Sequence, residues 1–123
     1  QVIHAPSKDV AKVLAKSITT SNLTKCAVYG KDANWGRILC AMGYAGVDFD
    51  PYKVDISIKS NCGEIKLVEN GMATDYDEEM ATNILSPEKV IILADIKAGE
   101  AEAVAWGCDL TYEYIKINAD YRS

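Results

Sequence analysis

The sequence predicts an α+β fold, in which a mostly antiparallel or mixed sheet is packed by about four helices in a single domain. Two observations lead to this prediction. Apolar residues recur at helical spacing in some segments and alternate with polar residues in others. These segments follow one another in the order helix, strand, helix, hairpin, helix, hairpin, helix. The length of 123 residues suits one domain with a core of its own.

The first half of the chain should form two helices and a short strand. The expected elements are a helix over residues 7–21, a strand over 25–29 and a helix over about 34–44. Ser7 and Asp32 are placed to cap the two helices. Gly30 should stop the strand, while Gly43 and Gly46 end the second helix.

The second half should contain two hairpins and a helix between them. The expected elements are strands at about 54–58 and 65–67, a helix from Asp77 to Leu85, and strands over 89–96 and about 102–108. The segments 60–63 and 97–99 have the composition of turns, and a further turn is expected at 68–71. Acidic residues in the first turn favour the start of the helix.

A final helix, capped by Asp109, should run to the end of the chain. Its apolar face would consist of Leu110, Tyr114, Ile117 and Tyr121. Asn118 lies beside this face, and a buried amide without hydrogen-bond partners costs on the order of 1–3 kcal/mol. From the helix alone, the backbone is favoured over a ligand as the partner of Asn118.

Composition and charge argue against nucleic-acid and membrane partners. The net charge is −5, and no basic patch is interleaved with aromatic residues. Lys8, Lys12 and Lys16 are interpreted as a solvated helix face. No apolar run reaches the length of a membrane span, and no signal pattern opens the chain. Gln1 follows no initiator methionine, so we expect a fragment or a processed subunit.

The cysteines predict neither a metal site nor disulfide bonds. They have no Cys-x-x-Cys spacing, and the single histidine, His4, lies near a terminus expected to be mobile. Cys26, Cys40 and Cys108 are expected to be small core side chains. We expect a reducing compartment, either the cytoplasm or the mitochondrial matrix of a eukaryote. Since no glycine-rich phosphate loop occurs, no cofactor is predicted.

The start of the second helix is a candidate binding site. Its free N–H groups and the guanidinium of Arg37 suit a carboxylate. Gly36 weakens the helix by about 1 kcal/mol relative to alanine, which suggests close packing there. The alternative is a capped helix whose arginine pairs with a neighbouring acid. The residues alone favour this alternative.

Two long motifs resemble a known enzyme family. They are residues 32–39, Asp-Ala-Asn-Trp-Gly-Arg-Ile-Leu, and residues 105–123, which end in Asn-Ala-Asp-Tyr-Arg-Ser. Residues 43–51 and 68–71 match in the same order between them. The chain resembles, over about residues 8–123, the ornithine acetyltransferase (glutamate N-acetyltransferase) family of arginine biosynthesis.

The resemblance implies a reaction and partners. Family members move an acetyl group from N2-acetylornithine to glutamate, and some also use acetyl-CoA. Their precursor cuts itself into two chains, and the new amino-terminal threonine of the second chain is the nucleophile. An oxyanion hole on the first chain stabilises the tetrahedral state. Residues 1–123 would then be the carboxyl-terminal domain of the second (beta) chain. By itself this fragment should be inactive, since its partners in a hetero-oligomer are the alpha chain and the rest of the beta chain.

Four residues carry over from the family motifs. Asn118 and Ser123 match residues that contact the amino-acid part of the substrate, so a ligand becomes the favoured partner of Asn118. Asp32 and Arg37 match the tryptophan motif and are assigned a supportive role. No catalytic residue is assigned within this chain.

The chain also departs from the family pattern. The nucleophilic threonine, its cleavage motif and a substrate-binding glutamate are missing, and we expect them upstream of Gln1. Residues 72–74, Met-Ala-Thr, resemble part of a cleavage site, but they lie too late in the family order and are interpreted as coincidence. Ala33 replaces the usual proline, a change that the start of a helix accepts.

Two other functions remain open at this point. The chain could be a non-enzymatic assembly domain whose helices and sheet edge serve only interactions. It could also belong to an amino-terminal-nucleophile hydrolase that passes the acyl group to water or a peptide. A glycine-rich segment ending in Ala-Thr upstream of Gln1 would favour an enzyme, and an acceptor assay would separate transfer from hydrolysis.

Overall fold

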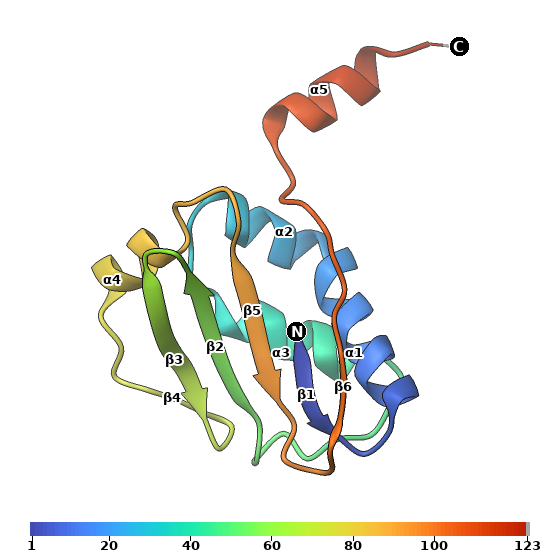
Figure 1. Cartoon of the computed structure of the whole chain (residues 1–123). Helices are drawn as coiled ribbons and strands as arrows, with labels where there is room; N and C mark the ends of the chain where they lie inside the picture. The colour runs from blue at the N-terminus through green and yellow to red at the C-terminus, as the bar shows by residue number, and fades with distance from the viewer. Residues whose placement is uncertain (123) are drawn as a thin grey trace.

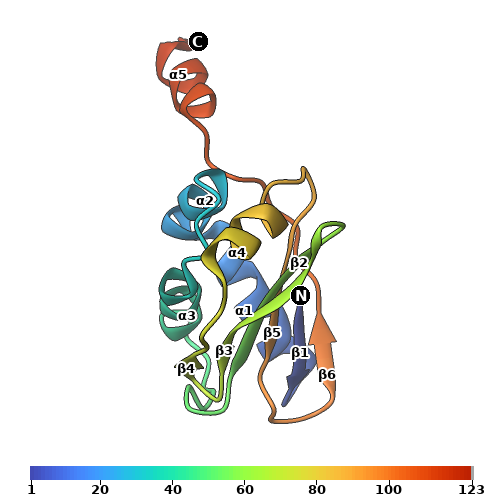
Figure 2. The ribbon, with the colours of Figure 1, turned by 90° about the vertical axis from the view of Figure 1, so that its left-hand side faces the viewer.

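The computed structural model describes residues 1–122 and divides them into two regions. Residues 1–103, which we call the body, form a mixed sheet with helices on one face. Residues 104–122, which we call the arm, leave the body as an extended segment and end in a projecting helix (Figures 1 and 2). The predicted α+β class with a mixed sheet is confirmed.

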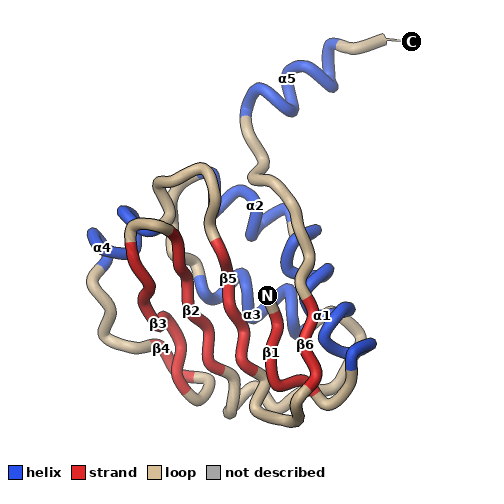
Figure 3. Tube along the Cα trace, viewed as in Figure 1, coloured by secondary structure: helices blue, strands red, loops and turns tan. Residues whose placement is uncertain are grey.

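The sheet has six strands in the order β4-β3-β2-β5-β1-β6 (Figure 3). The strands are β1 (Val2–Ala5), β2 (Asp55–Ser60), β3 (Gly63–Glu69), β4 (Met72–Ala73), β5 (Ile91–Asp95) and β6 (Ala101–Ala103). Strand β1 runs parallel to β5, and the other neighbouring pairs are antiparallel. The short strand β4 was not predicted.

Strand β1 is the main feature of the sheet that the sequence did not reveal. The backbone N–H of Ala94 donates to the carbonyl of Gln1 (2.9 Å), and that of Ala98 donates to the carbonyl of His4 (2.8 Å). Because β1 lies between β5 and β6, the expected hairpin of β5 with β6 is wrong. The mobile terminus expected around His4 is also wrong, because His4 lies within β1 and its Nδ1 is 2.8 Å from Oδ1 of Asp95.

Five helices occur within residues 1–122. They are α1 (Lys8–Thr20), α2 (Asn22–Tyr29), α3 (Trp35–Gly43), α4 (Glu78–Ile84) and α5 (Tyr112–Asp120). Helix α1 begins as predicted, with the N–H of Val10 donating to Oγ of Ser7 (3.2 Å). Helix α4 follows Asp77, which accepts from the N–H of Met80 (2.8 Å). None of these helices is long and apolar enough to cross a membrane.

The strand expected over residues 25–29 is wrong, because this segment belongs to α2. The helix begins at Ser21, whose Oγ accepts from the N–H of Thr24 (3.2 Å). Thr24 and Ala27, three positions apart, are both buried. An apolar run of this length fits a buried helix turn as well as a strand, and here the cap at Ser21 and the burial at helical spacing decide.

The turns between β2, β3 and β4 follow the prediction. Strands β2 and β3 form a hairpin around residues 61–62. The second turn places Asn70 and Gly71 at positive φ, 47° and 75°. A side chain at Gly71 would overlap the backbone carbonyl of Pro51, so only glycine fits this close approach.

The core lies between the sheet and the helices. Its largest fully buried side chains are Leu14, Met42, Ile56, Ile58, Leu67, Ile84, Ile96, Val2, Val54 and Val68. The basic row predicted on α1 is indeed exposed. The cysteines are different from the prediction: Cys26, Cys40, Cys62 and Cys108 are all exposed thiols. Small apolar residues, including Ala11, Ala15 and Ala41, fill the core instead.

Candidate functional site

The arm crosses the ends of two helices before it reaches α5. Its segment 104–111 is not a strand, so the strand predicted to continue to about residue 108 stops at Ala103. A Cβ on Gly107 would lie 3.1 Å from both Cβ and the carbonyl oxygen of Thr19. The backbone N–H of Leu110 donates to the carbonyl of Lys25 (3.3 Å). The arm is therefore held at the end of α1 and at Lys25 within α2.

Helix α5 is capped two residues later than the sequence predicted. The N–H of Tyr114 donates to Oγ1 of Thr111 (3.0 Å), so Thr111 and not Asp109 is the N-cap. Asp109 lies two residues before this cap, in the segment held by the Leu110–Lys25 bond. The helix therefore starts at Tyr112, two residues after Leu110.

The predicted apolar face of α5 contacts no core. No residue of α5 is buried, and Tyr114, Ile117 and Tyr121 are all more than half exposed. In Figures 1 and 2 the helix points away from the sheet and from the other helices. Within residues 1–122, the body therefore does not cover the predicted apolar face.

Asn118 is held by its own helix. Its Nδ2 donates to the backbone carbonyl of Tyr114 (2.8 Å), and the side chain is exposed rather than buried. This is the backbone partner that the helix pattern favoured. Contact of Asn118 with a substrate stays a prediction, and Ser123 lies outside the described residues.

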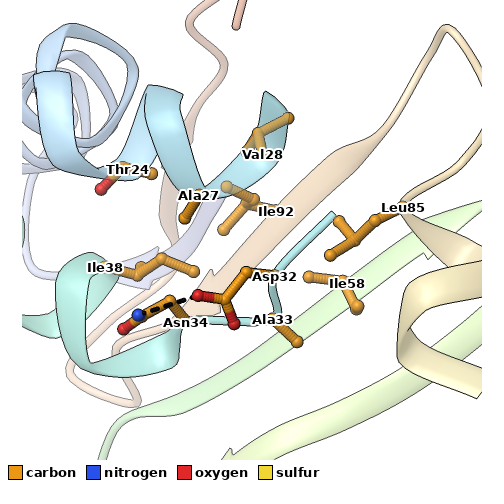
Figure 4. A pocket seen from close by; sticks show the side chains of 10 residues that line it. All are labelled: Thr24, Ala27, Val28, Asp32, Ala33, Asn34, Ile38, Ile58, Leu85 and Ile92. Carbon is orange, nitrogen blue, oxygen red and sulfur yellow. Dashed lines mark hydrogen bonds between the residues drawn. The ribbon is translucent and has the colours of Figure 1, made fainter. Parts of the chain in front are cut away.

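Asp32 supports the start of α3 without capping it. The N-cap is Asn34, whose Oδ1 accepts from the N–H of Arg37 (3.2 Å). Asp32 accepts from Nδ2 of the same asparagine (3.1 Å), as the dashed line in Figure 4 shows. The predicted cap at Asp32 is therefore wrong by two residues. Asp32 instead orients the amide that performs the capping.

Arg37 connects α3 to α2. Its Nη1 donates to the carbonyl of Leu23 (3.2 Å), and its own carbonyl accepts from Oγ1 of Thr24 (3.4 Å). Within residues 1–122 Arg37 forms no ion pair, so the carboxylate partner considered for it is not found there. Gly36 is not a point of close approach, because a Cβ would meet only Oδ1 of Asn34 at an ordinary 3.5 Å.

Two cavities lie beside Asp32, Asn34 or Arg37, and Asn118 is not part of the lining of either. A groove of about 520 Å³ is lined by Thr20, Ser21, Asn22, Leu23, Asn34, Gly36, Arg37, Cys40 and Tyr44. The second cavity, shown in Figure 4, has room for about one water molecule. It lies beside Asp32 under mostly apolar side chains. The structure thus brings Asp32, Asn34 and Arg37 together, and Asn118 lines neither cavity.

A cluster of charges around Asp55 was missed by the sequence reasoning. Oδ1 of Asp55 accepts from Nζ of Lys97 (2.8 Å) and from the N–H of Asn70 (2.9 Å), while Oδ2 accepts from Nζ of Lys66 (3.1 Å). Burial raises the pKa of this carboxyl, but the hydrogen bonds outweigh burial and hold the pKa below its usual value. The signal was an aspartate in an apolar strand, followed by the Asn70 turn.

The Asp55 cluster ties three parts of the sheet together. It joins β2 to the turn after β3 and to the segment after β5, where Lys97 has a positive φ of 54°. Nζ of Lys97 also donates to Oδ1 of Asn70 (2.9 Å). Within residues 1–122, no three His, Cys, Asp or Glu side chains are grouped to hold a metal ion. The cluster is a set of paired charges that fixes two turns.

Comparison with known proteins identifies relatives of the chain. Residues 1–123 match the model of the ArgJ family. The chain is 52% identical, over 99% of its length, to the "Arginine biosynthesis bifunctional protein ArgJ" of Caldanaerobacter subterraneus. It is 48% identical, over 98% of its length, to a "Glutamate N-acetyltransferase" of Methanopyrus kandleri. The chain spans 30% and 31% of the length of these two relatives.

A solved structure has the same fold. The crystal structure of the arginine biosynthesis bifunctional protein ArgJ from Bacillus halodurans matches with a TM-score of 0.90 and 41% sequence identity. The match covers 98% of this chain and 55% of that one. The resemblance carried by the two motifs is thereby confirmed. By its full-length family match and these relatives, the chain belongs to the ArgJ family.

Proposed function

We propose that the chain is part of an enzyme that moves an acetyl group from N2-acetylornithine to glutamate in arginine biosynthesis. The observation that carries the proposal is the match of the whole chain to the ArgJ family. One relative that is nearly half identical bears the name glutamate N-acetyltransferase. Because the chain spans about a third of its relatives, the activity belongs to a longer parent protein.

The place of the chain in this parent is part of the proposal. We place residues 1–123 in the carboxyl-terminal domain of the beta chain, which self-cleavage of the precursor separates from the alpha chain. The support is the closing motif, residues 105–123, which resembles the end of family sequences. The exposed apolar face of α5 agrees with a missing neighbour. The parent would work in the cytoplasm, or in the mitochondrial matrix of a eukaryote.

The proposed chemistry is a two-step acyl exchange. The hydroxyl oxygen of the upstream threonine attacks the acetyl carbonyl of acetylornithine, with the amine of the same threonine as the base. The C–N bond breaks, ornithine leaves with the proton, and the acetyl group stays as an ester. The amino group of glutamate then attacks this ester and releases the threonine hydroxyl. No residue of the present chain forms a covalent bond in either step.

Asn118 and Ser123 would bind the amino-acid part of the substrate. The amide of Asn118 has one acceptor oxygen and two N–H donors. Only Nδ2 is engaged within residues 1–122, and it is engaged with the helix backbone. This bond orients the amide and leaves Oδ1 available for the ammonium group of an amino acid. Asp32 and Arg37 would support the site indirectly by ordering the helices next to the arm.

The alpha chain and the rest of the beta chain are the proposed protein partners in a hetero-oligomer. Two surfaces of the chain suit such partners. One is the apolar face of α5. The other is the face of the sheet opposite the helices, where Ile3, Ile91 and Leu93 are only partly buried. Figure 2 shows that the helices of the body cover the other face of the sheet.

The test is an assay of the full-length parent. It should transfer acetyl from acetylornithine to glutamate, and Asn118→Ala should raise the KM for acetylornithine roughly tenfold or more, as for a lost bond to a charged group. Folding should be unaffected. Asn83→Ala, on the exposed surface of α4, is the matched control. No transfer by the parent would end the proposal, and release of acetate to water would identify a hydrolase instead.

The placement of the chain can be tested separately. Co-expression of residues 1–123 with the part of the parent upstream of Gln1 should restore transfer. A requirement for residues downstream of Ser123 would overturn the carboxyl-terminal placement. If residues 1–123 bind the upstream part but the full-length parent shows no transfer, the chain is an assembly domain. In the folded parent, equal losses of stability and substrate use in Asn118→Ala would mark Asn118 as a packing residue.

A further inference from the structure

We propose that Tyr29 and Tyr112 are positioning residues for the substrate contact made by α5. Their ring centroids lie 5.7 Å apart, and the ring planes meet at 85° in an edge-to-face arrangement. The contact joins the last residue of α2 to the first residue of α5. It would set the direction in which α5 leaves the body, and with it the position of Asn118. This inference rests on the proposed function.

The tyrosine pair is the last of three contacts along the arm. Gly107 lies against Thr19, and Leu110 is bonded to Lys25, but both residues belong to the extended segment before the helix. The pair acts on α5 itself. Since α5 buries none of its own residues, core packing does not fix its direction in the described chain. An aromatic edge-to-face contact has a preferred geometry, so it can supply this orientation.

Tyr29 belongs to α2, a helix held in place by hydrogen bonds to α3 and by buried residues. Helix α2 is joined to α3 by the bond from Arg37 to the carbonyl of Leu23 and by the bond from Thr24 to the carbonyl of Arg37. Thr24 and Ala27 are buried beneath it. Arg37 thus links α3 to α2, and Tyr29 links α2 to the arm. This gives a physical content to the supportive role assigned to Arg37.

The distance from Tyr112 to Asn118 turns a small tilt of α5 into a displacement of Asn118. Asn118 lies six positions after Tyr112, a distance of roughly 9 Å along the axis at 1.5 Å per residue. A tilt of about 20° at Tyr112 would move Asn118 by roughly 3 Å over that length. Such a shift would break a hydrogen bond to the substrate, because hydrogen bonds form within a narrow range of distance.

The experiment uses the full-length parent enzyme. Tyr29→Ala and Tyr112→Ala should each raise the KM for acetylornithine roughly 2- to 12-fold, the range that corresponds to an aromatic pair. The midpoint of thermal unfolding should stay the same. The double variant should show about the same rise as either single variant, because both remove one contact. Tyr29→Phe and Tyr112→Phe keep the rings and should restore the parental KM.

Tyr52→Ala is the matched control, because Tyr52 is 80% exposed and lies in the loop before β2, outside the arm. It should leave the KM unchanged. Unchanged KM values in both alanine variants would overturn the inference. So would additive effects of Tyr29→Ala and Tyr112→Ala, or a loss of activity that follows a loss of thermal stability.

Hydrogen exchange separates this inference from the proposed function. In the same full-length protein, Tyr29→Ala should speed exchange at the amides of residues 110–116, whereas Tyr52→Ala should not. This readout does not require acetyl transfer. A parent without transfer but with faster exchange would refute the proposed function and keep the role of the pair in orienting α5. Unchanged exchange would refute that role even in an active enzyme.

Discussion

Helices α1 and α5 carry the same kind of pattern and have opposite fates. Each has apolar residues at helical spacing, and each is capped by a hydroxyl side chain, from Ser7 and Thr111 respectively. Helix α1 buries four residues against the sheet, whereas α5 buries none. The body supplies a partner for one apolar face and not for the other. A helical pattern therefore predicts a face that needs burial, but not which surface will bury it.

The comparison is sharpest for two isoleucines. Ile56 in β2 is fully buried, while Ile117 in α5 is 63% exposed. In the isolated chain, Ile56→Ala should lower the free energy of unfolding by about 2–5 kcal/mol, because it leaves a cavity in the core. Ile117→Ala should change it by less than about 0.5 kcal/mol. Urea titration followed by circular dichroism measures both, and similar losses would show that α5 packs on the body in solution.

Two glycines test the close approach within the body. Gly71 and Gly46 both have positive φ, but only Gly71 faces backbone atoms at the position of a Cβ. Gly71→Ala should cost about 2–3 kcal/mol of unfolding free energy, from strain together with overlap. Gly46→Ala should cost about 1 kcal/mol, from strain alone. Thermal or urea unfolding gives both values. Equal costs would show that the turn at Gly71 can move away from Pro51.

The Asp55 cluster gives the stability of the body a pH dependence. Because folding lowers the pKa of Asp55, its contribution to stability is full above the unfolded pKa of about 3.9 and is lost as the pH falls through the lower folded value. At neutral pH, Asp55→Asn should cost about 1.5–2 kcal/mol, as for hydrogen bonds to a charged group.

The difference in unfolding free energy between the unsubstituted chain and Asp55→Asn should shrink below about pH 4. Unfolding in urea at several pH values between 7 and 2 measures it. Glu69, which pairs with Lys66, is present in both proteins. A difference that stays constant down to pH 2 would contradict the role assigned to Asp55.

The smallest effects should come from the cysteines, in the body and in the arm alike. Cys40 and Cys108 are exposed, so Cys40→Ser and Cys108→Ser should each change the unfolding free energy by less than about 0.5 kcal/mol. A thiol reagent should modify all four cysteines of the folded chain without denaturant. If any one cysteine is protected from the reagent, its thiol is packed in solution rather than exposed.

Local signals predicted much of the fold. Ser7 and Asp77 start their helices as expected, and the turns around Asn61 and Asn70 join the predicted strands, because caps and turns depend on neighbouring residues. Strand β1 was missed for the opposite reason. Val2 pairs with Ala94 and Ala103, so the signal for the strand lies about 90 to 100 residues away along the chain.

The candidate site was predicted only in parts. The sequence grouped Asp32 with Arg37, and the structure keeps both around Asn34. The cap was misplaced because Asp and Asn both favour the N-cap and stand two positions apart. Asn118 was correctly predicted to lie on a helix, but the helical pattern could not show that this helix would leave the body.

The position of β1 has a consequence for how the arm is attached. The strand lies as a wedge between β5 and β6, so β6 is joined to the rest of the sheet through Val2 and Ala5. Loss of these first residues would leave β5 with a bare edge and detach β6 from its ladder. The attachment of the arm therefore depends on residues 1–5, which lie about 100 residues earlier in the sequence.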